Sequence, residues 1–339
     1  MFCRHFPDDR PRRESWSGGE GLSTTYMHEG ESVKATADRH IPVLMDRCTE
    51  LLANAAHGLV VDATLGMGGH TEALLQTYPK IRVIGIDRDP RALELAGERL
   101  SAYGDRFEAF HGTYDQIAEA ADEADGVLMD LGVSSMQLDE EERGFSYSSD
   151  APLDMRMDTT TGISAAELVN TASAAELREI LYRYGEEKFA PAIAARIVKR
   201  REESPLTRTS ELAEIVRESI PAPARRTGGN PAKRTFQAIR VAVNDELAIL
   251  ERAVPAALDV LAPSGRIVVM AYQSLEDRIV KRALARVTTS QTPHGLPVQI
   301  DEPEFRLLTR GAERATDDEI ARNPRAASVR LRAAERRSR

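Results

Sequence analysis

The chain has 339 residues, with 45 Lys and Arg against 54 Asp and Glu, a net charge of −9 at pH 7 and two cysteines. The length predicts about two domains with sizeable cores, and no apolar run reaches the roughly 20 residues of a membrane span. The charge excludes a protein that is basic overall, so any contact with nucleic acid must come from local basic patches. Cys3 and Cys48 lack the spacing of a metal or redox site, which fits a reducing cytoplasm.

Residues 1–39 are charged or polar with little apolar periodicity, and we expect a disordered N-terminal extension. They lack the apolar core of a signal peptide, and Met27 is an alternative candidate for the first residue. The folded part is predicted to begin at His40, with its first helix over residues 48–56.

The central feature of the sequence is a strand–loop–helix–strand pattern. A strand predicted over 59–62 ends in Asp62, a glycine loop and a helix follow, and a second strand over 82–87 ends in Asp87. Open α/β sheets bind ligands at the carboxyl ends of their strands. Glycines let the backbone approach a ligand closely, and a helix start presents unpaired N–H groups. Asp87 lies 18 residues after Gly69, a spacing suited to a carboxylate that binds two ribose hydroxyls.

Two cofactor classes use this arrangement, dinucleotides and S-adenosylmethionine. The dinucleotide fingerprint requires a third small residue after Gly-x-Gly. Here Gly66 and Gly68 are followed by Thr71 at that position, which argues against NAD.

Further apolar strands alternate with helices, which predicts an α/β fold with a parallel sheet. Asp89 and Pro90 form the cap and first turn of a helix that runs to Leu100. We expect the last two strands to form an antiparallel pair that closes the sheet. The remaining strands are predicted at 107–110, 126–130, 266–271, 305–308 and 328–333.

The pattern becomes helical in residues 141–234, which we interpret as an insertion into the sheet domain. Ser164 and Ser173 begin capping boxes with Glu167 and Glu176, and helical periodicity continues beyond them. A long amphipathic helix is predicted over 235–261, and Ser274 is expected to cap a helix over 274–287. The predicted division is therefore a discontinuous sheet domain, 40–140 and 235–339, interrupted by the insertion 141–234.

Several longer motifs closely resemble the bacterial small-subunit ribosomal RNA cytosine-N4 methyltransferases, the RsmH (MraW) family. The resemblance covers roughly residues 40–334 and is far more specific than the glycine loop. The motifs occupy residues 40–44, 130–139, 143–146, 152–158, 234–238 and 274–278.

The resemblance implies a Rossmann-like, S-adenosylmethionine-dependent methyltransferase sheet with an inserted helical domain. It implies methylation of N4 of a cytosine in the decoding region of 16S, or small-subunit, ribosomal RNA, on free RNA or an assembling subunit in the cytoplasm. The family's cofactor-contacting positions correspond to Gly68, Gly69, His70, Asp87, Tyr114, Asp130 and Gln137. The sequence departs from the family at 270–273, where Ser-Phe-His is more common before Ser274, and after Ala326.

We assign the candidate catalytic role to Asp130, since a carboxylate facing the cytosine amine would help to localise its lone pair. Alternatives are a cofactor contact or an N-cap for the next turn. Tyr114 is expected to stack near the adenine and Gln137 to hydrogen-bond it, whereas His70 is expected to act mainly through its backbone. No second histidine lies at ligand spacing, so no metal is expected.

Two segments carry most of the local positive charge. Residues 196–240 hold eleven Lys and Arg against five Glu, and residues 322–339 hold seven Arg against one Glu. Either could contact phosphates, and 141–234 is the candidate RNA-recognition domain. Two other functions stay open: an amino-methyltransferase acting on DNA or protein, and a non-catalytic ribosome-assembly factor that binds RNA. The sequence leaves the oligomeric state open.

Overall fold

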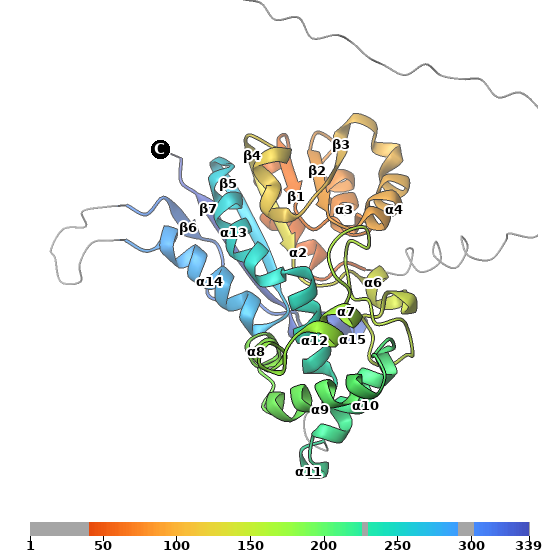
Figure 1. Cartoon of the computed structure of the whole chain (residues 1–339). Helices are drawn as coiled ribbons and strands as arrows, with labels where there is room; N and C mark the ends of the chain where they lie inside the picture. The colour runs from red at the N-terminus through yellow and green to blue at the C-terminus, as the bar shows by residue number, and fades with distance from the viewer. Residues whose placement is uncertain (1–40, 226–229, 291–301, 339) are drawn as a thin grey trace, which may run out of the picture. The chain divides into compact units, whose positions relative to one another are not determined.

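The computed structural model describes residues 41–225, 230–290 and 302–338, so the expected disorder of 1–39 and the predicted start at His40 lie outside the described residues. Within these ranges the strands form one seven-stranded sheet in the order β3-β2-β1-β4-β5-β7-β6 (Figure 1). Strands β1 to β5 are parallel, and β7 runs antiparallel to β5 and β6. This confirms the α/β fold with a closing antiparallel pair. The strands are β1 (Leu59–Asp62), β2 (Arg82–Asp87), β3 (Phe107–His111), β4 (Ala124–Asp130), β5 (Leu261–Ala271), β6 (Phe305–Leu307) and β7 (Arg330–Arg336).

The direction in which the chain adds strands reverses at β1, which pairs with β2 on one side and β4 on the other. In sheets of this type such a reversal opens a crevice at the carboxyl ends of the strands. Asp62, Asp87 and Asp130 are the last residues of β1, β2 and β4, so the topology brings three carboxylates to this edge.

Alternate strand residues face opposite sides of the sheet, and each side is covered by helices. Val61 and Val127 pack in a core with residues of α5, α13 and α14. Val60 and Leu128 pack on the other side with residues of α2, α3 and α4. These helices are α2 (Met45–Leu51), α3 (Gly69–Thr77), α4 (Pro90–Leu100), α5 (Ile117–Ala120), α13 (Glu246–Asp259) and α14 (Ser274–Thr288).

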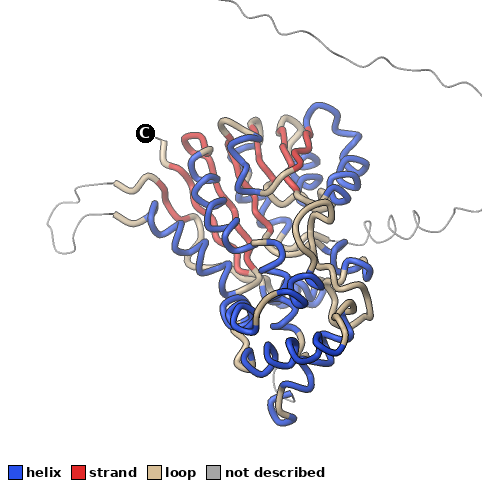
Figure 2. The backbone as a smooth tube through the Cα atoms, in the orientation of Figure 1, coloured by secondary structure: helices blue, strands red, loops and turns tan. Residues whose placement is uncertain are grey.

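A third core lies among the remaining helices, near the carboxyl ends of the strands (Figure 2). It contains Leu177, Ile193 and Leu212 from the segment predicted as an insertion, together with Phe236 and Ile239. The helices around this core are α7 (Ala165–Thr171), α8 (Ala174–Gly185), α9 (Ala190–Glu203), α10 (Thr209–Ser219), α11 (Ala222–Arg225) and α12 (Lys233–Asn244). Of the remaining helices, α6 (Ser135–Asp139) follows β4 and α15 (Asp317–Arg322) precedes β7.

The prediction of one long helix over 235–261 is wrong. The chain forms α12 and α13, separated by Asp245 in a left-handed conformation with φ of 51°. The Asn244 side chain donates to the carbonyl oxygen of Met155 at 2.7 Å and accepts from the amide of Met157 at 2.8 Å, which fixes this break against a loop. Leu261 already belongs to β5. The periodicity misled because both helices bury apolar residues and only the polar contacts of Asn244 mark the break.

Local capping signals agree with the structure at three helices, of which α4 is capped by Asp89 as predicted, and fail at a fourth. Ser164 and Ser173 cap α7 and α8 as predicted. Ser274 does not cap α14; it is the first helical residue, and Gln273 is the N-cap. The reason is the buried carboxylate of Glu276, which accepts the amides of Tyr272 at 2.9 Å and Gln273 at 3.0 Å.

The first helix differs from its predicted bounds, since α2 ends at Leu51 and residues 53–55 form a separate 3-10 turn. No helix in the described ranges is both long and apolar enough to cross a membrane.

Candidate active site

A cavity of about 610 Å³ lies at the carboxyl ends of β1, β2 and β4. Six of the seven predicted site residues line it: Gly69, His70, Asp87, Tyr114, Asp130 and Gln137. Gly68 is not a lining residue. It is the N-cap of α3, with φ of 76°, and a Cβ at this position would lie 2.9 Å from Leu100 Cδ1. Gly68 thus allows α3 to start against α4, while the neighbouring glycines face the cavity.

Asp87 holds the glycine loop in place. Its Oδ2 accepts the amide of Gly66 at 2.8 Å and its Oδ1 accepts the amide of Asp89 at 2.9 Å. Burial raises the pKa of Asp87 to about 6. Each carboxylate oxygen has a second lone pair, so Asp87 can still accept hydrogen bonds from a bound polyol.

Asp130 contacts polar groups from three other segments. Its amide donates to Thr64 Oγ1 at 2.6 Å, and its Oδ1 accepts the Tyr272 hydroxyl at 2.7 Å. Its Oδ2 lies 3.6 Å from Nε2 of His70. That nitrogen is buried and has no hydrogen-bond partner among the described residues. The His70 ring, and not only its backbone, therefore belongs to the site.

Tyr114 and Arg88 attach the cavity wall to the break between α12 and α13. The Tyr114 hydroxyl donates to the carbonyl oxygen of Glu246 at 3.2 Å, and Arg88 donates to that of Asn244 at 2.7 Å. Burial raises the pKa of the Tyr114 phenol. The Tyr114 ring therefore forms a fixed wall of the cavity, with its hydroxyl turned to the protein.

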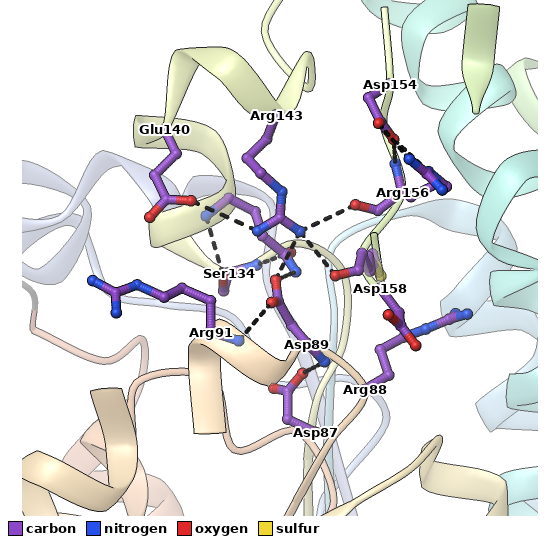
Figure 3. A network of polar contacts seen from close by, with 12 residues as sticks. Asp87, Arg88, Asp89, Arg91, Ser134, Glu140, Arg143, Asp154, Arg156 and Asp158 are labelled. Carbon is purple, nitrogen blue, oxygen red and sulfur yellow. Dashed lines mark hydrogen bonds and ion pairs between the residues drawn. The ribbon is translucent and has the colours of Figure 1, made fainter. Parts of the chain in front are cut away.

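Gln137 joins the polar network beneath the cavity that contains Ser134, Asp89 and Arg143, all three of which are labelled in Figure 3. Its Oε1 accepts the amide of Ser134 at 3.1 Å and its Nε2 donates to Oδ2 of Asp89 at 3.0 Å. Arg143 reaches the same Asp89 oxygen at 2.9 Å and also donates to the carbonyl oxygens of Arg156 and Met157. Both functional ends of the Gln137 amide are thus engaged, leaving one N–H for a ligand.

Sequence reasoning missed a charged cluster that borders the cavity. Arg240 lines the cavity and forms two bonds of 2.8 Å with the carboxylate of Glu246. Burial raises the pKa of nearby Glu276 to about 7, against the opposing effect of Arg240. Glu276 lies in a recognised motif, but its contacts with the Tyr272 and Gln273 amides could not be inferred from that motif.

The described residues contain no group of three or more His, Cys, Asp or Glu side chains arranged to hold a metal ion. The donors that line the cavity are instead glycine-loop backbone, carboxylates, a phenol and an imidazole. This set suits an organic ligand with hydroxyl and amine groups, and Arg240 and Gln273 line the same cavity as Asp130.

Comparison with known proteins shows which proteins this chain is similar to. The family model described as the MraW methylase family matches residues 37–337. A protein of Mycolicibacterium smegmatis named ribosomal RNA small subunit methyltransferase H is 60% identical over 312 residues, covering 88% of this chain and 84% of that protein. A protein of the same name from Beutenbergia cavernae is 61% identical over 307 residues, covering 88% and 92%. Among solved structures, an rRNA methylase from Streptococcus thermophilus aligns with a TM-score of 0.41 and 13% identity, covering 88% and 99%.

Proposed function

The chain belongs to the MraW methylase family, and we propose that it methylates N4 of a cytosine in the decoding region of small-subunit (16S) ribosomal RNA. The relatives named ribosomal RNA small subunit methyltransferase H support the coarser statement, an rRNA methyltransferase that uses S-adenosylmethionine. A cytoplasmic location and an assembling small subunit as the substrate particle are parts of the same proposal.

The observation that carries the proposal is that Asp87 and Asp130 line the same cavity. Asp87 is fixed by two backbone amides and keeps lone pairs for ribose hydroxyls, while Gly66 and Gly69 leave room along the cavity wall. These residues fit S-adenosylmethionine, which supplies an electrophilic methyl carbon when bound. We assign Gly69, Asp87, Tyr114 and Gln137 to the cofactor, with Gly68 supporting the loop.

The residues around Asp130 can prepare the cytosine amine. Tyr272 holds one carboxylate oxygen, so the other oxygen is presented beside His70. That oxygen would accept a hydrogen bond from an N–H of the amine. The hydrogen bond favours the form of the amine in which the attacking lone pair is localised on nitrogen. The same oxygen, with His70 Nε2 at 3.6 Å, can then hold the proton that the amine loses. Orientation of the two reactants supplies most of the remaining acceleration.

The division into a discontinuous sheet domain, 40–140 and 235–339, and a helical insertion, 141–234, remains part of this proposal. We assign RNA recognition to the insertion because its helices lie near the carboxyl ends of the strands (Figure 2). The target base must leave its stack to reach a buried methyl group, at a cost of a few kcal/mol that contacts in the cavity must offset.

Deletion of the gene, followed by mass spectrometry of small-subunit rRNA nucleosides, tests the cytosine assignment. We expect N4-methylated cytidine to disappear and to return with the wild-type gene. Unchanged N4-methylation would contradict the assignment and favour an amino-methyltransferase acting on DNA or protein. Calorimetry of the purified protein distinguishes a methyltransferase from a non-catalytic ribosome-assembly factor. The assembly factor would show no binding of S-adenosylmethionine.

A further inference from the structure

Part of the positive charge of the two basic segments is neutralised in the folded chain, although Lys233 stays exposed at the cavity. In residues 196–240, several arginines are paired with carboxylates at the surface or at the cavity: Arg196 with Glu218, Arg208 with Asp150, Arg217 with Glu214 and Arg240 with Glu246. The C-terminal arginines behave alike: Arg325 pairs with Asp139, Arg330 and Arg332 with Asp277, Arg336 with Glu304 and Arg337 with Glu302. A count of charges along the sequence therefore does not locate the cations that remain available.

A row of available cations lies outside both segments, on one face of α14. Arg278, Lys281, Arg282 and Arg286 follow the spacing i, i+3, i+4 and i+8, so they form a single stripe, which we call the α14 stripe. All four are exposed, while Val280 and Leu284 are buried on the opposite face of the helix. Within the described ranges, Lys281, Arg282 and Arg286 form no ion pair, and Arg278 makes a single loose pair of 3.6 Å with Glu186.

The α14 stripe starts at the cavity. Tyr272 and Gln273, the residues before α14, line the cavity that contains Asp130. Glu186, just after α8, accepts the Ser274 hydroxyl at 3.3 Å and pairs with Arg278, which places the end of α8 beside the first turns of α14 (Figure 1). Tyr182, in the last turn of α8, is 71% exposed. An exposed aromatic ring thus lies near the start of a row of four cations, three of which form no ion pair within the described ranges.

We propose that the α14 stripe binds the phosphates of single-stranded RNA beside the target cytosine, and that Tyr182 stacks on one of its bases. This inference rests on the proposed function. Unpaired, exposed cations bind phosphates without first breaking an internal ion pair, and they gain from counterion release. Aromatic rings next to such cations are typical of surfaces that bind single strands. The stripe spans about 12 Å from Arg278 to Arg286, given the helical rise of 1.5 Å per residue.

The test compares two double variants that remove the same charge. Lys281→Gln with Arg282→Gln alters the stripe, whereas Lys80→Gln with Arg82→Gln alters exposed cations at the opposite, amino-terminal edge of β2. Fluorescence anisotropy would measure binding of a labelled single-stranded RNA of about 16 nucleotides, within the usual range of site sizes. For the stripe variant we expect about tenfold weaker binding in roughly 50 mM salt. Its plot of log affinity against log salt should be shallower by about 1.4, since each phosphate contact contributes about 0.7.

Tyr182→Ala should weaken the same binding about tenfold with an unchanged salt slope, whereas Tyr182→Phe should bind as the wild type does. Wild-type affinity and slope in the stripe variant, or equal losses in both double variants, would overturn the proposal. A stripe variant that methylates subunits poorly yet binds RNA normally would also overturn it, in favour of a protein contact. Because binding is measured without cofactor, a wild type that binds RNA through the stripe but does not methylate cytosine would contradict only the proposed function.

Discussion

The hydroxyl of Tyr272, just after β5, donates to Oδ1 of Asp130, at the end of β4, over 2.7 Å. Strands β4 and β5 are neighbours, with Asp130 opposite Met270, so the bond joins two adjacent strand ends. It leaves Oδ2 of Asp130 as the oxygen that faces His70. A carboxylate held at one oxygen presents the other in a fixed direction, which is what proton transfer from a weak nucleophile requires.

Tyr272→Phe should lower kcat about tenfold, because it removes a hydrogen bond to a charged group while the ring remains. The KM for S-adenosylmethionine should stay near the wild-type value, since Asp87 is untouched. Steady-state methyl transfer to unmethylated small subunits measures both constants. Tyr78→Phe is the matched control; it loses a bond to the carbonyl oxygen of Thr49 and lies outside the cavity. An unchanged kcat in Tyr272→Phe would show that Asp130 needs no such support.

Asp130→Asn should lower kcat by at least about 10² with little change in cofactor affinity, as expected for loss of a general base. The amide keeps the size of the side chain and an oxygen for Tyr272. Single-turnover methyl transfer and calorimetry with S-adenosylmethionine separate the two effects. If cofactor affinity falls as far as turnover does, Asp130 binds the cofactor and does not act on the amine.

The short-range features of this site were predictable from sequence. Asp62, Asp87 and Asp130 each end an apolar strand, and parallel strands bring such ends to one edge, so the pattern alone indicated where the cavity lies. The glycine loop gave the turn into α3. Each of these signals lies within a few residues of the group it positions.

The other contacts could not be predicted because they join distant segments. Tyr272 meets Asp130 across 142 positions, and Asn244 fixes the loop at Met155 across 89. Their pairing depends on strand order and on a helix break, neither of which alters the apolar periodicity. The same limit applies to charge: many arginines of the basic segments are paired with carboxylates from distant parts of the chain, and the unpaired cations of α14 lie outside both segments.

Cofactor binding should depend on pH through Asp87. Burial raises the pKa of this carboxyl to about 6, and only the ionised form can accept from both ribose hydroxyls while holding the loop amides. Affinity should therefore be constant above about pH 7 and fall up to tenfold per pH unit below 6. Calorimetry with S-adenosylmethionine from pH 5 to 8 measures this. Asp87→Asn should bind weakly with no such dependence; a wild type whose affinity does not change across this range would exclude the ribose role.

Folding stability should depend on pH through Glu276. Burial raises its pKa from 4.5 to about 7, so the folded chain holds a proton that the unfolded chain releases at lower pH. The contribution of the protonated Glu276 carboxyl to folding stability is complete below about pH 4.5 and is lost as the pH rises through 7. Glu276→Gln keeps an oxygen for the Tyr272 and Gln273 amides without this loss.

Urea denaturation at pH 5 and pH 8 measures the effect. From pH 5 to 8, the free energy of unfolding of Glu276→Gln should rise relative to wild type by on the order of 2–3 kcal/mol. Glu98→Gln, on an exposed position of α4, should show no comparable change. A constant difference between wild type and Glu276→Gln would mean that Glu276 is ionised throughout.

The pair formed by Arg143 and Asp89 should matter more for stability than any exposed ion pair. The Asp89 side chain is only 2% exposed and caps α4, and Arg143 is its cation at 2.9 Å (Figure 3). Arg143→Met should lower the free energy of unfolding by about 3 kcal/mol, because it leaves a buried carboxylate without its charge partner and frees two carbonyl oxygens. Arg91→Met, which breaks the exposed pair with Glu94, should change it by less than about 1 kcal/mol. Denaturant titration measures the free energy of unfolding of both variants. Equal, small losses of this free energy would show that the hydrogen bond from Gln137 is enough to satisfy Asp89. The network beneath the cavity would then not depend on Arg143.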